Sequence, residues 1–135
     1  MKQIEKGKLY LVTGGSGFLG HEIIDRILKK GGRVRTIVRD EGKLIDLQQK
    51  YPDIEILTGD IADKFDTRQS LLGVDGVFHA AAFKHVGLAE TQARECVRTN
   101  LIGSLNILEQ SADMELDFIF DRFSIMQMEK IIRRR

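Results

Sequence analysis

The sequence lacks the features of a secreted or membrane-spanning protein. Its only cysteine, Cys96, cannot form an internal disulfide, and it suits a reducing compartment, where we expect it to be a small core residue. No apolar run is long enough to cross a bilayer. Residues 1–8 are too polar for a signal peptide. We therefore expect a cytoplasmic protein that does not insert into a membrane.

An excess of charge of one sign is also lacking, because 21 lysine and arginine residues nearly balance 20 aspartate and glutamate residues. Such a chain has no electrostatic basis for binding nucleic acid or an anionic membrane surface. Tryptophan is absent, but aliphatic residues are plentiful, and 135 residues are enough for one domain with a real core. We therefore predict a single domain over residues 1–135 and no nucleic-acid partner.

Glycine is abundant by contrast, and three glycines follow a short apolar segment. Residues 9–12 have the length and composition of a strand, and they lead through Gly14, Gly17 and Gly20 into an amphipathic helix predicted over residues 19–30. In such a turn one glycine allows a sharp bend, one leaves room for phosphate, and one lets the helix pack closely. The start of the helix then directs N–H groups at the phosphates. The pattern predicts a nucleotide pyrophosphate site.

Two other motifs are excluded by the residues around these glycines. Gly15 and Gly20 have the spacing of a P-loop, but His21 stands where that motif requires lysine. Ser16 would need a glycine two residues later to form a nucleophile elbow, and that position is Phe18. A tight surface turn without a ligand remains the alternative interpretation.

Residues 13–20, TGGSGFLG, resemble the TGxxGFxG fingerprint of extended short-chain dehydrogenases/reductases, which act largely on nucleotide sugars. The resemblance implies an α/β fold, namely a Rossmann-like doubly wound parallel sheet of about five strands with helices on both faces. It also implies that an NAD(P) cofactor contacts six residues of this turn. They are Gly14, Ser16, Gly17, Phe18, Leu19 and Gly20.

The end of the second predicted strand, residues 33–38, bears on the choice of cofactor. An acidic residue at this point binds the ribose hydroxyls of NAD, whereas an arginine accommodates the additional phosphate of NADP. The chain has Arg39 here and Lys43 shortly after, so NADP is favoured. Asp40 keeps NAD as the alternative. If the loop is merely solvated, neither cation has a ligand.

A short helix is predicted over residues 43–50, with Leu44, Ile45 and Leu47 facing inward, and a third strand over residues 54–57. The GDIxD segment that follows resembles the family segment whose aspartate contacts the adenine amino group and whose next residue packs on the ring. The resemblance gives these roles to Asp60 and Ile61. The commoner use of such an aspartate is as the N-cap of a helix, here one expected within residues 63–73.

Residues 74–82 are predicted to be the fourth strand and its exit. Ala80, Ala81 and Ala82 are small enough to let the backbone approach the cofactor. We expect His79 to be a hydrogen-bonded histidine at the strand end, because no second metal ligand has suitable spacing. No metal site is predicted.

The residues after the alanines resemble one branch of this family in particular. Residues 83–86, FKHV, resemble part of the AAxKHV segment of the polysaccharide-biosynthesis branch, which includes UDP-N-acetylglucosamine 4,6-dehydratases. In that branch the segment borders the sugar-nucleotide pocket. By this resemblance Lys84 offers charge to a diphosphate and His85 offers a hydrogen bond, although an exposed loop explains both residues as well.

The longest predicted helix covers residues 90–112. Its apolar positions share one face: Ala93, Val97, Leu101, Leu105, Leu108 and Ala112. Residues 98–109 resemble the NxxGxxNxLE pattern of the family, in which Asn100 matches the asparagine that supports the active-site water and backbone network. Asparagine is unfavoured within a helix, which is consistent with a polar task. In many relatives this helix forms part of a dimer face, so a homo-oligomer is implied.

The resemblance ends near residue 112. A fifth strand is predicted over residues 117–120, but residues 113–135 depart from the family pattern and end in a helix-like tail. Short-chain dehydrogenases use a tyrosine and a lysine four residues later as their acid and base. Here Tyr10 is followed at that spacing by Gly14, and Tyr51 by Glu55.

The sequence thus predicts the dinucleotide-binding part of a nucleotide-sugar dehydratase or epimerase that lacks turnover of its own, either separated from its substrate part or ended early. A UDP-sugar is expected only in a full-length relative. Two alternatives stay open. One is a stand-alone nucleotide-binding sensor or assembly module, and the other is a complete reductase with an unconventional base.

Overall fold

The computed structural model describes residues 4–80 and 90–121, and strands alternate with helices throughout. In chain order the elements are β1 (Leu9–Thr13), α1 (Phe18–Lys29), β2 (Arg33–Val38), α2 (Glu41–Lys50), β3 (Glu55–Thr58), α3 (Lys64–Leu71), β4 (Gly76–His79), α4 (Glu90–Gln110) and β5 (Phe118–Asp121). Every predicted strand and helix in this range is present in its predicted order. The sequence analysis is confirmed at this level.

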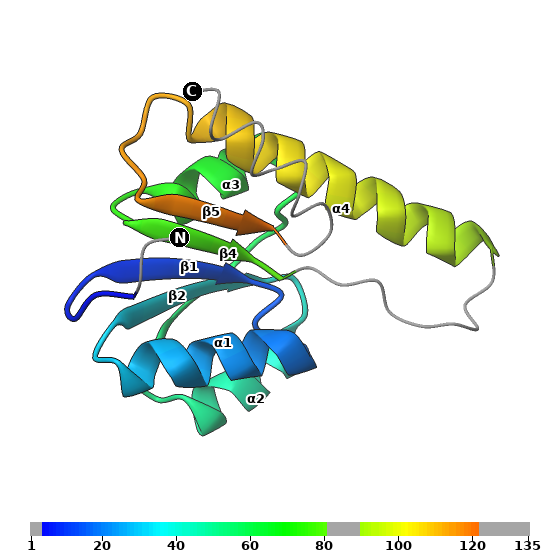
Figure 1. Ribbon diagram of the computed structural model, residues 1–135. Coiled ribbons are helices and arrows are strands. Elements are labelled where there is room, and N and C mark those ends of the chain that lie inside the picture. Colours follow the sequence, from blue (N-terminus) through cyan, green and yellow to red (C-terminus); the bar gives the residue numbers. More distant parts are fainter. Residues whose placement is uncertain (1–3, 81–89, 122–135) are drawn as a thin grey trace.

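The five strands form one parallel sheet in the order β3-β2-β1-β4-β5. Helices α1 and α2 cover one face of it, and α3 and α4 cover the other (Figure 1). This is the predicted Rossmann-like doubly wound arrangement. The strand order reverses between β1 and β4, and ligands of such sheets bind at the carboxyl ends of the strands on either side of this point.

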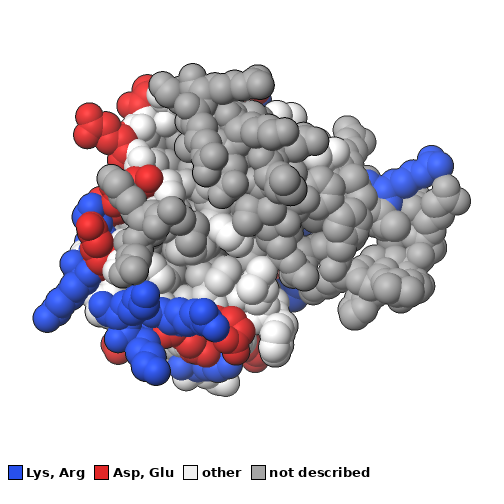
Figure 2. Space-filling view, viewed as in Figure 1, with Lys and Arg blue, Asp and Glu red and all other residues white. Residues whose placement is uncertain are grey.

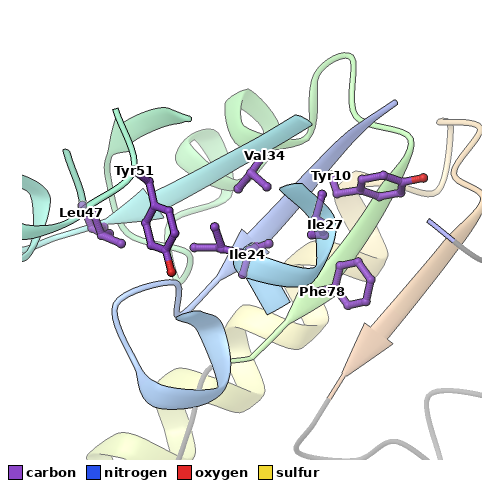
Figure 3. Close-up of a cluster of buried hydrophobic side chains, with 9 residues drawn as sticks. Tyr10, Ile24, Ile27, Val34, Leu47, Tyr51 and Phe78 are labelled. Atoms are coloured by element: carbon purple, nitrogen blue, oxygen red, sulfur yellow. The ribbon is translucent and has the colours of Figure 1, made fainter. Parts of the chain in front are cut away.

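Each face of the sheet has its own hydrophobic cluster. On the side of α1 and α2, Ile24 and Ile27 pack with Tyr10, Val34 and Leu47 (Figure 3). On the other side, Leu71 and Ile107 pack with Leu9, Leu11 and Val77 of β1 and β4. β1 is buried along its whole length, as expected for the central strand of a parallel sheet covered on both faces.

The ends of α1 and α2 lie at residues that commonly end helices. Gly31 has a φ of +82°, a conformation that L-residues rarely adopt, and it lies just after the C-cap of α1. α2 ends at Lys50, directly before Tyr51 and Pro52. These local signals explain why the helix boundaries were predictable.

The predicted buried faces of the helices were partly wrong. Ile45 is exposed, and so are Leu101 and Leu105 of α4. Over residues 101–111, the buried positions are instead small and polar residues together with two aliphatic ones: Gly103, Ser104, Asn106, Ile107 and Leu108 of α4, and Ser111 just after it. The cause is specific packing of α4 against α3 and the segment before it, which outweighs the apolar periodicity.

Charges of both signs are mixed on the part of the surface that Figure 2 shows as described, with lysine and arginine beside aspartate and glutamate. This agrees with the balanced composition. Among residues 4–80 and 90–121, no helix is both long enough and apolar enough to cross a membrane.

Candidate functional site

The glycine turn joins the end of β1 to the start of α1. Gly14 has a φ of +69°, and its carbonyl oxygen accepts a hydrogen bond from the Gly17 N–H at 3.0 Å. A Cβ on Gly20 would overlap that same carbonyl oxygen and would lie 2.7 Å from the Cα of Gly15. Gly14 therefore makes the bend, and Gly20 lets α1 pack against it.

The start of α1 differs from the starts of α2 and α3. Gly17 is its N-cap and has no side chain to accept a hydrogen bond, and the first turn contains no acidic residue. Asp40 and Asp63 cap α2 and α3 with their carboxylates. In α1 the first intrahelical bond runs from the His21 N–H to the Gly17 carbonyl at 2.9 Å. The backbone N–H groups before His21 therefore have no partner within the helix. Such N–H groups at a helix start can bind an anion.

Gly15 has a role that the sequence analysis missed. A Cβ on this residue would lie 2.6 Å from Oγ1 of Thr36, a buried residue of β2. That hydroxyl donates a hydrogen bond to the Val12 carbonyl at 2.6 Å. Gly15 thus brings the turn against β2. The sequence did contain a signal for this role. Gly15 is the second of two adjacent glycines, and neither the bend nor the phosphate contact requires a glycine there.

The other predicted residues of the turn are more exposed than its glycines Gly15 and Gly20. Phe18 is 87% exposed, whereas Ser16 and Leu19 are half-buried. Phe18 is the first residue of α1, so an exposed aromatic side chain stands at the start of this helix. The turn therefore presents an apolar ring beside its N–H groups.

The end of β2 brings Arg39 close to Asp60. Nη1 of Arg39 lies 3.4 Å from Oδ2 of Asp60, and the arginine side chain is two-thirds exposed. Oδ1 of Asp40 accepts hydrogen bonds from the N–H groups of Gly42 and Lys43, at 2.7 and 3.2 Å. Asp40 is therefore the N-cap of α2, while Arg39 points to the end of β3.

The segment after β3 is fixed by several hydrogen bonds. Oδ1 of Asp60 accepts from the Ala62 N–H at 2.9 Å, and the Asp60 N–H donates to Oδ2 of Asp66 at 3.0 Å. The N-cap of α3 is Asp63, whose carboxylate accepts from the Asp66 N–H at 2.9 Å. The alternative interpretation of Asp60 as an N-cap is therefore wrong.

The carbonyl oxygen of Ile61 accepts two side-chain hydrogen bonds. Oγ1 of Thr67 donates to it at 2.7 Å from α3, and Nδ2 of Asn106 donates at 3.0 Å from α4. Gly103 lies beside the same residue, since a Cβ there would come within 2.9 Å of Cγ2 of Ile61. The sequence analysis gave Asn106 and Gly103 no roles of their own within the NxxGxxNxLE pattern.

The ends of β1 and β4 are joined through a buried pair. Oγ1 of Thr13 and Nδ1 of His79 are 2.5 Å apart, and the Ala80 N–H donates to the Thr13 carbonyl at 3.1 Å. His79 is 1% exposed, which confirms the prediction of a hydrogen-bonded histidine at the strand end. Within the described ranges no group of three His, Cys, Asp or Glu residues could hold a metal ion.

A cluster of polar side chains lies between α1 and the end of α2. The hydroxyl of Tyr51 donates to Oδ1 of Asp25 at 2.7 Å, and Nζ of Lys50 donates to Nδ1 of His21 at 2.9 Å. Burial, and then the hydrogen bond to Asp25, raise the pKa of the Tyr51 hydroxyl. Burial, and then the charge of Lys50, lower the pKa of His21. An acid–base tyrosine needs a lowered pKa, so Tyr51 is unsuited to that role.

Some predicted residues lie outside the described part of the chain. They include Ala81, Ala82, Lys84, His85 and the tail over residues 125–135. Asn100 belongs to α4, but its side chain and that of Cys96 are also outside the description.

Known proteins similar to this chain include nucleotide-sugar enzymes and an uncharacterised protein. An uncharacterised membrane protein of Methanocaldococcus jannaschii is 39% identical over 115 residues, which are 83% of this chain and 34% of that protein. The UDP-glucose 4-epimerase of Rickettsia conorii is 34% identical over 75% of this chain and 32% of the enzyme. The UDP-N-acetylglucosamine 4,6-dehydratase (inverting) of Campylobacter jejuni is 34% identical, with shares of 76% and 32%. The chain spans about a third of the length of these relatives.

Solved structures show the same arrangement of strands and helices. The structure of Pen from Bacillus thuringiensis matches 88% of this chain and 38% of its own, with 30% identity and a TM-score of 0.79. The dTDP-glucose 4,6-dehydratase DesIV of Streptomyces venezuelae, solved with NAD bound, matches 82% of this chain and 38% of its own, with 25% identity and a TM-score of 0.66.

A family model described as polysaccharide biosynthesis protein matches residues 10–120, which include all five strands except the last residue of β5 and the first of β1. The relatives include an epimerase and a dehydratase of the kind that the glycine turn resembled. The chain belongs to the polysaccharide biosynthesis protein family, within the extended short-chain dehydrogenases/reductases, and it matches the N-terminal portion of these proteins.

Proposed function

We propose that this chain binds NADP, with NAD as the alternative, along the carboxyl ends of β1, β2, β3 and β4. The observation that carries the proposal is the start of α1, where a glycine turn leaves the first N–H groups without a carboxylate cap. In this proposal six residues of the turn surround the pyrophosphate: Gly14, Ser16, Gly17, Phe18, Leu19 and Gly20. A relative solved with NAD bound supports a nicotinamide dinucleotide as the ligand.

The preference for NADP rests on the two neighbouring residues Arg39 and Asp40. Oδ1 of Asp40 already accepts hydrogen bonds from two backbone N–H groups of α2. This oxygen is therefore less available to bind the ribose hydroxyls of NAD. The guanidinium of Arg39 is two-thirds exposed at the end of β2 and is suited to a 2′-phosphate. Lys43, in the first turn of α2, adds a second cation.

The adenine is proposed to lie beside Asp60 and Ile61, and the other half of the dinucleotide beside Ala80, Ala81 and Ala82. The amide ring and ribose at that end would approach backbone that small side chains leave accessible. Lys84 and His85 would contribute to a UDP-sugar site only in a longer polypeptide, where Asn100 would support the active-site water and backbone network. A homo-oligomer through the exposed face of α4 is part of the same proposal.

Turnover of a sugar nucleotide by these residues alone is not expected. Neither tyrosine is followed at the required spacing by lysine, and the pKa of Tyr51 is raised rather than lowered. Binding energy without a positioned acid and base does not lower the barrier of the chemical step. We therefore propose a binding function for this part of the protein.

Calorimetric titration of the purified chain with NADP⁺ and, separately, with NAD⁺ tests this function, with a melting curve at saturating ligand in each case. We expect saturable binding, tighter for NADP⁺, and a melting temperature that rises with ligand concentration. A folded chain that binds neither dinucleotide would overturn the proposal. Tighter binding of NAD⁺ would overturn only the preference for NADP.

A further inference from the structure

We infer that Asn106 is a positioning residue for the adenine end of the proposed site, through the backbone of Ile61. The inference rests on the proposed function, because it concerns how the same site selects its base. Asn106 lies in α4, far along the chain from the segment that it holds. Its amide is the link from that helix to the residues beside the adenine.

The contact is buried and directional. Asn106 is 3% exposed, and its Nδ2 donates to the Ile61 carbonyl at 3.0 Å. An amide nitrogen can only donate, so a side chain of similar size without a donor cannot replace it. Because a buried polar group must find a partner, the amide holds α4 in one rotation against this segment.

Gly103 allows this close approach. It lies one helical turn before Asn106 on the same side of α4, and a Cβ there would lie 2.9 Å from Cγ2 of Ile61. The absence of a side chain lets the helix backbone come close enough for the amide to reach the carbonyl. This accounts for the buried small and polar residues of α4 where Leu101 and Leu105 are exposed.

The carbonyl of Ile61 is held from both helices on this face of the sheet, since Thr67 of α3 donates to it at 2.7 Å. The single proton of the Thr67 hydroxyl is shared with the Asp63 carbonyl, at 2.9 Å, so a full bond from Asn106 and a shared one from Thr67 direct the Ile61 carbonyl toward the helices. The adjacent carboxylate of Asp60 is held through its own bond to the Ala62 N–H, one residue beyond Ile61. The peptide group that joins Ile61 to Ala62 is therefore held at its carbonyl by the helices, and its N–H holds the Asp60 carboxylate. That carboxylate is the acceptor that would meet the adenine amino group.

This arrangement makes a prediction about base selection. A carboxylate held in place accepts a hydrogen bond from the 6-amino group of adenine, whereas hypoxanthine presents an oxygen acceptor at the same position. A hydrogen bond to a charged group is worth enough to give a preference of about tenfold or more for the adenine dinucleotide. If Asn106 positions the segment, its loss should reduce this preference rather than simply weaken all binding.

The experiment compares binding of NADP⁺ and its hypoxanthine analogue to the wild-type chain, to Asn106→Leu and to a control variant. Ser111→Ala is the control, because Ser111 directly follows α4 and is as buried as Asn106, but its hydroxyl donates to the Leu108 carbonyl, at 3.4 Å, and not to the segment after β3. We expect the preference for adenine to fall severalfold in Asn106→Leu and to be unchanged in Ser111→Ala. If Asn106→Leu does not fold, Asn106→Ala, which removes the amide without adding bulk, replaces it.

Amide hydrogen exchange of the unliganded protein gives a second readout that needs no nucleotide. We expect the Ala62 amide to exchange about tenfold faster in the Asn106 variant, while amides of β1 exchange at the wild-type rate. An unchanged Ala62 rate would contradict the inference, and so would equal weakening of both dinucleotides. A wild-type chain that binds both analogues equally would also overturn it. If the wild type binds neither dinucleotide, the proposed function fails, whereas the exchange result still decides whether Asn106 holds the segment.

Discussion

Arg39 at the end of β2 and Asp60 after β3 meet at one edge of the sheet, with Nη1 and Oδ2 separated by 3.4 Å. β2 and β3 are adjacent and parallel, so their carboxyl ends bring together two residues that the sequence assigned to the same end of a dinucleotide. The pair is exposed, and such pairs contribute about 0–1 kcal/mol to stability. Its guanidinium can therefore turn to a ligand at little cost to the fold.

Replacing Arg39 with alanine should weaken binding of NADP far more than binding of NAD. A charge-assisted contact with the 2′-phosphate is worth about 1.5–3 kcal/mol, so we expect a loss of roughly tenfold to a hundredfold for NADP. Titration calorimetry with both dinucleotides measures the difference. Arg33→Ala, at the opposite end of β2, is the matched control and should alter neither affinity. Equal losses for the two cofactors in Arg39→Ala would refute the role of Arg39.

Gly17→Val should abolish nucleotide binding while the domain stays folded. Gly17 has a φ of −84° and a ψ of 171°, which any residue adopts, and a Cβ there would lie 3.4 Å from the Gly14 carbonyl oxygen, an ordinary contact. The side chain would instead occupy the place proposed for the pyrophosphate. We expect a melting temperature close to that of the wild type and no measurable binding. Unchanged affinity would show that the phosphates lie elsewhere.

Gly20→Ala should produce the opposite result. Its Cβ would overlap the Gly14 carbonyl oxygen and press on Gly15, both of which are backbone and cannot move aside independently. We expect the free energy of unfolding to fall by about 3 kcal/mol or more, measured by urea denaturation. A variant with wild-type stability would mean that α1 can shift away from the turn.

The order of strands and helices was predictable because its signals are local. The β-branched run of residues 33–38 matches β2 residue for residue, and Gly31 and Pro52 mark the ends of two helices. The glycine turn was equally predictable, since a bend, a close contact or a helix start each requires glycine at a defined position. Resemblance to a family then supplied roles that spacing alone does not give.

The rotation of α4 was not predictable in this way. Its aliphatic residues suggested a buried face that includes Leu101 and Leu105, but both are exposed. The buried side instead includes Asn106, which donates to the Ile61 carbonyl, and Gly103, which lies against Ile61; apolar periodicity indicates neither contact. Similarly, the sequence could not show that Asp63 rather than Asp60 would cap α3, because both precede the helix by a short distance.

The exposed leucines of α4 give a prediction about self-association. Leu101 and Leu105 are 45% and 55% exposed one turn apart, on the helix that the resemblance places in a dimer face. We expect the wild-type chain to form a concentration-dependent dimer and the double variant Leu101→Glu, Leu105→Glu to be monomeric in sedimentation experiments. Leu72→Glu, at an equally exposed leucine after α3, is the control and should leave association unchanged. A monomeric wild type at high concentration would contradict the prediction.

His21 should make stability depend on pH. Burial, followed by the charge of Lys50, lowers its pKa in the folded state below the ordinary value of 6.5, and Asp25 opposes this only in part. The unfolded chain therefore takes up the proton first, so this contribution to stability is complete above pH 6.5 and is lost as the pH falls through the lower folded pKa.

We expect the wild type to lose more stability than His21→Gln between pH 7.5 and pH 5, because glutamine is not protonated and can still accept a hydrogen bond from Lys50. Urea denaturation at several pH values measures the two slopes. Lys50→Met separates the causes: since burial acts more strongly than Lys50, this variant should retain most of the pH dependence that distinguishes the wild type from His21→Gln. Identical slopes for the wild type and His21→Gln would show that burial of the imidazole in this cluster does not penalise its charged form.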